Sequence, residues 1–137
     1  MKSLIDVAIA TMTVVMEARG EPRRGKLAVA YVLVNRMKSG NSMTDVVLRP
    51  WQFSCWNTDS PTRMNMDKVD DALWAECMSC VLAAMHGLEP DPTAGAIFYL
   101  NKAVVINAQG KLPDWWHTDG HAASEVTIGL HSFRRKA

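Results

Sequence analysis

Cysteine is scarce in this 137-residue chain, which has only Cys55, Cys77 and Cys80. An odd number does not make a closed disulfide framework. Cys77 and Cys80 fall within a helical pattern rather than at a turn, which predicts buried free thiols. His117 and His121 have the i, i+4 spacing of helical metal ligands, but the glycine between them argues against a helix. The sequence therefore predicts no metal and no cofactor.

The chain also lacks a strong net charge and a long apolar run. Lysine and arginine total 15 against 14 acidic residues, a formal net charge of +1, so no overall field favours nucleic acid or an anionic membrane surface. No apolar stretch reaches the length of about 20 residues that a transmembrane helix needs, and we expect no stable membrane insertion. Asp6 interrupts the apolar N-terminal segment, and no small-residue cleavage site follows before Glu17. We therefore expect synthesis in the cytoplasm without a signal peptide.

Helical periodicity is the main pattern in the sequence, of which 48% is hydrophobic. Helices are predicted over 3–18, 23–38, 42–48 and 67–86, with a loop over 51–57. The second of these is apolar nearly all round, which is typical of a central buried helix. Strands are predicted over 96–100 and 103–106, paired around Asn101 and Lys102, and over 126–130. The whole pattern predicts one domain over 1–137, of α+β class and mainly helical, with a small antiparallel sheet.

Glu17 is the most informative acidic residue because it lies beside the first helix break. Gly20 is predicted to cap the first helix and Pro22 to begin the second. Glu17 would then lie near the negative end of the helix dipole and beside apolar side chains, and both influences disfavour ionisation. A carboxyl that keeps its proton near neutral pH can act as the acid in cleavage of a glycosidic bond. The same position also suits a surface ion pair with an arginine such as Arg19.

Four motifs in order resemble the SleB/CwlJ-type cell-wall hydrolases, a family that includes spore cortex-lytic enzymes and some phage lysins. They are E-A-R-G-E-P from Glu17 with G-K-L-A-V-A-Y-V-L-V-N-R from Gly25, Q-F-S with W-N over 52–57, D-P-T with G-A over 91–96, and I-G-L-H-S-F over 128–133. The resemblance covers nearly the whole chain and implies a lysozyme-like fold, with the acid at a helix end above a long groove. Met16 departs from the family pattern, which has glycine before the acid, and Ile97 and Phe98 replace residues that are often tyrosine or histidine.

The resemblance implies that Glu17 is the catalytic residue and that the partner is the glycan strand of peptidoglycan. The bond cut would join N-acetylmuramic acid to N-acetylglucosamine, commonly in a lytic transglycosylase. One carboxyl suffices there, because it protonates the glycosidic oxygen and then deprotonates the muramyl 6-hydroxyl, closing a 1,6-anhydro ring without water. The candidates for substrate binding are Glu21, Gln52, Ser54, Trp56, Tyr99, Trp115 or Trp116, and His131.

Each of these candidates also has a structural interpretation. Glu21, next to Pro22, suits a helix N-cap or an acid that orients its neighbours. The aromatic side chains suit core packing as well as they suit sugar contacts. His131 suits a buried structural role.

Other functions remain open on the sequence alone. A muramidase that adds water would need a second acid, for which Glu21, Asp45 and Asp59 are candidates. A non-catalytic wall-binding module would use the tryptophans alone, and an amidase would need a metal site that these histidines do not assemble. We expect a monomeric phage endolysin that reaches the cell wall in the periplasm once the inner membrane is permeabilised.

Overall fold

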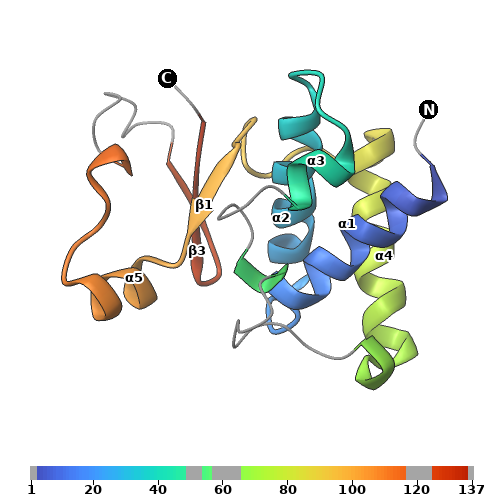
Figure 1. Cartoon of the computed structure of the whole chain (residues 1–137), viewed down its shortest axis with the longest axis horizontal. Helices are drawn as coiled ribbons and strands as arrows, with labels where there is room; N and C mark the ends of the chain where they lie inside the picture. Colours follow the sequence, from blue (N-terminus) through green and yellow to red (C-terminus); the bar gives the residue numbers. More distant parts are fainter. Residues whose placement is uncertain (1–2, 49–53, 57–65, 117–124, 136–137) are drawn as a thin grey trace.

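The structure of the chain, a computed structural model, describes residues 3–48, 54–56, 66–116 and 125–135. Its helices are α1 (Leu4–Ala18), α2 (Arg23–Met37), α3 (Met43–Leu48), α4 (Asp71–His86) and α5 (Lys102–Gln109). Its strands are β1 (Phe98–Leu100), β2 (Val126–Ile128) and β3 (His131–Arg134), and short 3-10 turns cover Ser54–Trp56, Met66–Lys68 and Asp114–Trp116. Figure 1 shows α1–α4 gathered at one side of the molecule, with the sheet and α5 at the other. The predicted mainly helical α+β class is confirmed.

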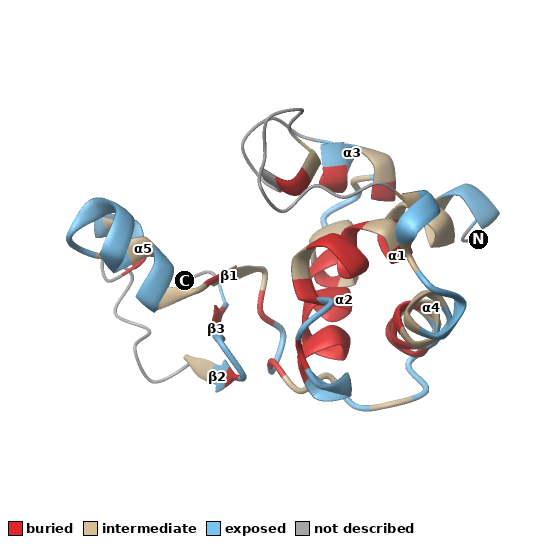
Figure 2. Cartoon of the chain, turned by 90° about the horizontal axis from the view of Figure 1, so that it is seen from below, coloured by how far each residue is buried: buried red, intermediate tan, exposed pale blue. Residues whose placement is uncertain are grey.

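Helix α2 is the centre of the core because nearly all its side chains from Leu27 to Val34 are apolar. Every residue from Gly25 to Leu33 is buried, and both α1 and α4 pack against this helix. Figure 2 shows the buried surface concentrated on α2 and on the faces of its neighbours that point toward it. Removing this apolar surface from water is the main favourable contribution to folding. The predicted central helix is thus confirmed.

The α1–α2 corner differs in detail from the prediction. Helix α1 begins with the capping box of Ser3 and Asp6, but its C-cap is Arg19, in right-handed helical geometry, and not Gly20. The amide of Glu21 donates to the carbonyl of Ala18 at 2.9 Å, so the corner closes as a right-handed turn that needs no left-handed glycine. Pro22 is the N-cap of α2 rather than its first helical residue, because its ψ of 168° is extended.

Helix α3 begins at its capping box, whereas α4 begins later than predicted. Ser42 and Asp45 exchange hydrogen bonds at the start of α3, as expected of a capping box. Helix α4 begins at Asp71 rather than at Asp67, because the side chain of Asp70 accepts from the amide of Leu73 at 2.7 Å. A separate 3-10 turn precedes it. The predicted loop over 51–57 is wrong at Ser54–Trp56, where a 3-10 turn forms, and its remaining residues lie outside the described part.

The sheet is antiparallel, with strand order β1-β3-β2. The predicted strand over 103–106 is wrong: those residues belong to α5, because the side chain of Asn101 caps that helix by accepting from the amide of Val104. The strand predicted over 126–130 ends at Ile128. Gly129, with φ of +59°, and Leu130 form the turn into β3, a strand that the sequence pattern did not indicate.

The three cysteines are buried and free, as predicted. Burial raises the pKa of Cys77 to about 11, so its thiol stays protonated at neutral pH. Across the described ranges, no helix combines the length and apolar character needed to cross a membrane.

Candidate active site

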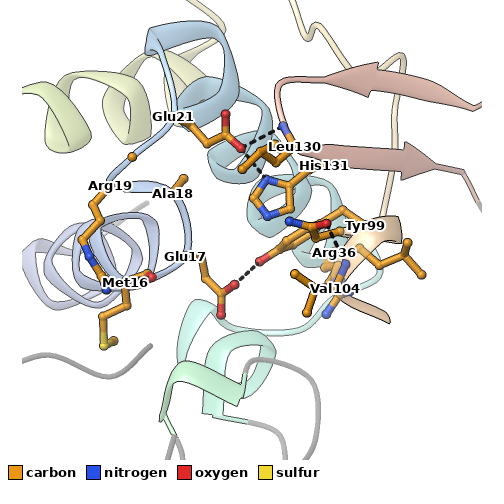
Figure 3. A pocket seen from close by; sticks show the side chains of 13 residues that line it. Met16, Glu17, Ala18, Arg19, Glu21, Arg36, Tyr99, Val104, Leu130 and His131 are labelled. Carbon is orange, nitrogen blue, oxygen red and sulfur yellow. Dashed lines mark hydrogen bonds and ion pairs between the residues drawn. The ribbon is translucent and has the colours of Figure 1, made fainter. Parts of the chain in front are cut away.

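A pocket of about 580 Å³ lies between the end of α1 and the sheet (Figure 3). One wall comes from the α1–α2 corner and α2, and the other from β1, α5 and the β2–β3 turn. The lining residues are Met16, Glu17, Ala18, Arg19, Gly20, Glu21, Arg36, Tyr99, Leu100, Asn101, Val104, Leu130 and His131. Of the sequence-predicted site residues, the structure therefore brings together Glu17, Glu21, Tyr99 and His131.

Glu17 projects from the last turn of α1 toward Tyr99 on β1 (Figure 3). The phenolic hydroxyl of Tyr99 donates to Oε2 of Glu17 at 2.9 Å. Burial, together with the negative charge of Glu17, raises the pKa of Tyr99 well above its ordinary value. Tyr99 therefore keeps its proton at neutral pH, and its hydroxyl fixes one oxygen of the Glu17 carboxyl.

Glu21 lies on the same wall but is almost completely enclosed, with 8% of its surface exposed. Its Oε1 accepts from the amide of Leu130 at 3.1 Å. The Nδ1 atom of His131 lies 3.2 Å from the same oxygen, within ion-pair distance. The motif at the α1–α2 corner and the I-G-L-H motif near the C-terminus thus meet through one carboxylate.

His131 stands between the two acids of the pocket. Burial lowers the pKa of its imidazole, and the charges of Glu21 and Glu17 offset part of that effect. The imidazole meets the ring of Tyr99 edge-on, with 5.2 Å between ring centroids. A neutral imidazole at this position packs on Tyr99 without placing a permanent positive charge beside Glu17.

The remaining predicted site residues lie away from this pocket or outside the described part. Trp56 packs on the core and its indole N–H donates to Oγ1 of Thr13 at 2.9 Å. Trp115 is 52% exposed and contacts Phe98 and Trp116. Gln52 lies outside the described residues, as does the side chain of Ser54.

The D-P-T-x-G-A motif is a structural turn between α4 and β1. The Asp91 carboxylate accepts from the amide and the hydroxyl of Thr93 at 2.8 and 2.7 Å, from the amide of Gly95 at 3.0 Å and from the side chain of Asn35 at 3.0 Å. Asn35 also donates to the carbonyl of Ala96 at 2.9 Å. This network fastens the segment that leads into β1, the strand that carries Tyr99, to α2.

Sequence reasoning missed Arg36 as a pocket residue. Its Nε donates to the carbonyl of Ile97 at 2.6 Å, and its guanidinium lies 5.7 Å from the centre of the Phe98 ring. The sequence signal that could have identified Arg36 is its positive charge near the end of a helix that is otherwise largely apolar and buried. Asn101 and Val104 were also missed, since their segment was assigned to a strand pair.

Within the described ranges, no group of three or more His, Cys, Asp or Glu side chains is arranged to hold a metal ion. His117 and His121 lie outside those ranges.

Comparison with known proteins identifies the family. The family described as Cell Wall Hydrolase matches residues 20–134. The chain belongs to this cell wall hydrolase family. Glu21 lies inside the matched range and Glu17 lies just before it. The expected resemblance to SleB-type hydrolases is thereby confirmed.

Individual relatives of the family agree with this assignment. The chain is 30% identical over 103 residues to a spore cortex-lytic enzyme of Oceanobacillus iheyensis, covering 70% of this chain and 32% of that one. It is 31% identical over 99 residues to the spore cortex-lytic enzyme of Bacillus subtilis, covering 70% and 29% respectively. The chain thus spans about a third of the length of these curated relatives.

Solved structures extend the match to the whole chain. The catalytic domain of the Bacillus cereus SleB protein superposes with a TM-score of 0.73 at 27% identity, covering 98% of this chain and 93% of that one. The catalytic domain of the germination-specific lytic transglycosylase SleB from Bacillus anthracis gives a TM-score of 0.67 at 26% identity, covering 97% and 96% respectively. The lysozyme-like fold expected from the sequence is confirmed by these neighbours.

Proposed function

We propose that the chain is a peptidoglycan-degrading enzyme that cuts the bond between N-acetylmuramic acid and N-acetylglucosamine, with Glu17 as general acid and base. The observation that carries this proposal is the Glu17 carboxyl in a pocket of about 580 Å³, held at one oxygen by Tyr99. A pocket of this size is typical of small-ligand and sugar sites. Membership of the cell wall hydrolase family supports the same substrate class.

The proposed reaction uses one carboxyl twice. Protonated Glu17 gives its proton to the glycosidic oxygen as the bond to the anomeric carbon of the muramyl residue breaks. The resulting carboxylate then takes the proton of the muramyl 6-hydroxyl, whose oxygen attacks the anomeric carbon and closes the 1,6-anhydro ring. The proton balance of Glu17 is restored and no water is consumed.

A lytic transglycosylase fits the pocket better than a muramidase that adds water. A muramidase needs a second carboxyl to activate water or stabilise the intermediate. Among the described pocket residues only Glu17 and Glu21 carry carboxyls, and the latter is turned onto Leu130 and His131. Asp45 is engaged at the start of α3, and Asp59 lies outside the described residues.

The substrate contacts that we propose follow the pocket wall. Tyr99 and His131 present ring edges and faces to the same space as Glu17, and Arg36 and Asn101 supply polar groups there. Gln52, Ser54 and the exposed Trp115 remain proposed substrate contacts. Trp56 is better explained by packing, because its indole N–H is used on Thr13.

The decisive experiment compares Glu17→Gln with Glu76→Gln on purified cell walls. Glutamine cannot give up a proton, so Glu17→Gln should lower the release of muropeptides at least about 100-fold. Glu76 lies on α4, outside the pocket lining, and its substitution makes the same chemical change. We expect it to leave activity unchanged. Undiminished lysis by Glu17→Gln would refute the assignment.

Mass spectrometry of the released fragments separates the candidate activities. Anhydro-muropeptides, one water lighter than reducing ends, would support the transglycosylase. Reducing ends would favour a muramidase. Retention of the protein on walls without any released fragment would instead favour a wall-binding module.

We further propose that the enzyme acts as a phage endolysin, reaching the wall after the inner membrane is permeabilised. Expression in bacterial cells tests this role. Lysis should follow only when a membrane-permeabilising protein or agent is added, and lysis of cells with intact membranes would contradict it.

A further inference from the structure

Two glycines far apart in the sequence leave room for the Glu21 side chain. A Cβ atom placed on Gly129 would lie 2.1 Å from Oε2 of Glu21 and 2.9 Å from its Cδ, and one placed on Gly25 would lie 2.8 Å from its Cβ. Real Cβ atoms do not approach other heavy atoms so closely. Gly129 also has φ of +59°, and the backbone of the β2–β3 turn lies directly against the carboxylate at this residue.

The two residues that follow Gly129 both direct a polar group toward the same carboxylate. The amide of Leu130 donates to Oε1 at 3.1 Å, and Nδ1 of His131 lies 3.2 Å from that oxygen. Since Glu21 is only 8% exposed, the hydrogen bond from the Leu130 amide takes the place of a water molecule that burial excludes from the carboxylate. Although Glu21 borders the pocket, a side chain so enclosed has little exposed surface from which to reach a substrate.

The contacts continue from His131 to the proposed catalytic group. The imidazole of His131 meets Tyr99 edge-on at 5.2 Å, and Tyr99 donates its hydroxyl to Glu17 at 2.9 Å. Figure 3 shows these side chains arranged in that order across the pocket. Glu21, His131, Tyr99 and Glu17 thus form a continuous series of contacts. Both ends of this series, Glu21 and Glu17, lie at or beside the α1–α2 corner.

We propose that Glu21 is a positioning residue: it fastens the Gly129–Leu130 turn to the α1–α2 corner and so holds His131 and Tyr99 where Tyr99 can hydrogen-bond Glu17. This inference rests on the proposed function only in naming Glu17 as the reacting group. It assigns Glu21 neither a proton-transfer step nor a contact with the glycan.

Activity of paired Glu21 variants separates positioning from catalysis. Gln keeps the side-chain volume and an acceptor oxygen for the Leu130 amide, whereas Ala removes both. We expect Glu21→Gln to retain activity within about fivefold and Glu21→Ala to lose at least about tenfold, mainly in kcat, as expected for loss of a buried hydrogen bond to a charged group. A loss in Glu21→Gln as large as that in Glu17→Gln would make Glu21 a catalytic acid and overturn the proposal. Full activity of Glu21→Ala would overturn it as well.

A spectroscopic measurement tests the link to His131 without any use of activity. Among the residues that the structure describes, the charged or titratable groups that face this imidazole are Glu21 from the corner, Glu17 from α1 and the Tyr99 hydroxyl from β1. The imidazole Cε1–H signal, assigned by its loss in His131→Gln, can be titrated by NMR. Glu21→Gln should lower the pKa of His131 below that in the unaltered chain, because a negative charge at 3.2 Å is removed. An unchanged titration and chemical shift would refute the link, whatever the result for Glu17→Gln.

Thermal unfolding tests the fit between Glu21 and Gly129. Gly129→Ala adds both left-handed backbone strain and a clash with the carboxylate, but only the clash disappears when Glu21 is already alanine. We expect Gly129→Ala to lower Tm more in the unaltered chain than in Glu21→Ala. Equal decreases in Tm would show that Glu21 does not occupy this space, and the proposal would fail.

Discussion

The hydrogen bond from Tyr99 to Glu17 links two residues that lie 82 positions apart in the sequence. Because burial and the Glu17 charge raise the pKa of Tyr99, the phenol stays protonated at neutral pH and can donate a hydrogen bond. It can therefore stabilise Glu17 most when that residue is a carboxylate, after the proposed proton transfer. Tyr99 was predicted as a sugar contact, and the structure adds this second interaction to the same side chain.

Tyr99→Phe removes only the hydroxyl and leaves the ring packed on His131 and Phe133. We expect kcat to fall about 10- to 100-fold, the range for one hydrogen bond to a charged group, with little change in KM. Tyr31→Phe is the matched control, because Tyr31 donates its hydroxyl to the carbonyl of Glu89 away from the pocket. Steady-state kinetics on soluble glycan fragments measures both variants. A rise in KM with unchanged kcat would instead make Tyr99 a simple binding residue.

At the scale of elements, the sequence predicted the helices well and part of the sheet badly. The apolar pattern of α1 and α2 is long enough for helical periodicity to dominate, and the caps at Ser3, Ser42 and Gly87 are local signals. In 103–106 the β-branched residues favour a strand, but the Asn101 cap starts a helix whose side chains remain partly or fully exposed. A short apolar run does not by itself distinguish these outcomes.

For the candidate site, as for the fold, the sequence indicated some of the residues but not how they contact one another. Glu17 and Glu21 could be chosen from the corner motif, and His131 from the closing motif. No sequence spacing places the Leu130 amide on Glu21 or Tyr99 on Glu17, because those distances are set by packing of the sheet against α1 and α2. Trp115 illustrates the limit, since an exposed aromatic is equally compatible with sugar stacking and with a surface position.

The turn that carries Asp91 shows how an element outside the pocket sets its geometry. Burial opposes ionisation of Asp91, but hydrogen bonds from Asn35, Thr93 and Gly95 outweigh it and lower the pKa of the carboxyl below 3.8. The stabilisation is therefore fully present above pH 3.8 and is lost as the pH falls through the lower pKa of the folded state.

Asp91→Ala should cost about 3 kcal/mol in the free energy of unfolding at pH 7, because the variant leaves several donors without an acceptor. The variant should also lose less stability on acidification than the unaltered chain does. Urea unfolding at pH 7 and at pH 3 measures both effects. Asp114→Ala serves as the control, since Asp114 forms an exposed pair with Lys111 and its substitution should change stability little. If Asp91→Ala lowered the free energy of unfolding no more than Asp114→Ala does, the Asp91 turn would not stabilise the fold as proposed.

On the scale of the whole molecule, the pocket is shared by two groups of elements. Glu17 lies on α1 and Glu21 at the α1–α2 corner, whereas Tyr99 lies on β1, Leu130 in the β2–β3 turn and His131 on β3. Figure 1 shows the helices and the sheet as two separate groups of elements. In the described part of the chain, hydrogen bonds cross between the two groups from Arg36 to Ile97, from Asn35 to Ala96 and through the two glutamates. Ile128 and Phe133 of the sheet also pack in the hydrophobic core with the helices. A glycan strand lying in the pocket would touch both groups and add to these connections.

Binding of a glycan fragment should therefore slow hydrogen exchange in both walls of the pocket and raise the stability of the folded protein. We expect N-acetylated wall fragments, from disaccharide to tetrasaccharide, to raise the Tm of Glu17→Gln, a variant that cannot cleave them. At a fragment concentration 100 times Kd, the free energy of unfolding should rise by about 2.7 kcal/mol. Hydrogen exchange should slow at both the α1–α2 corner and the β2–β3 turn, because a bound ligand would contact both segments and restrict their motion. Cello-oligosaccharides, which lack the N-acetyl groups, provide the control and should give a smaller shift. Protection confined to one wall would mean that the glycan does not lie between Glu17 and His131, and the catalytic geometry proposed for this pocket would then have to be abandoned.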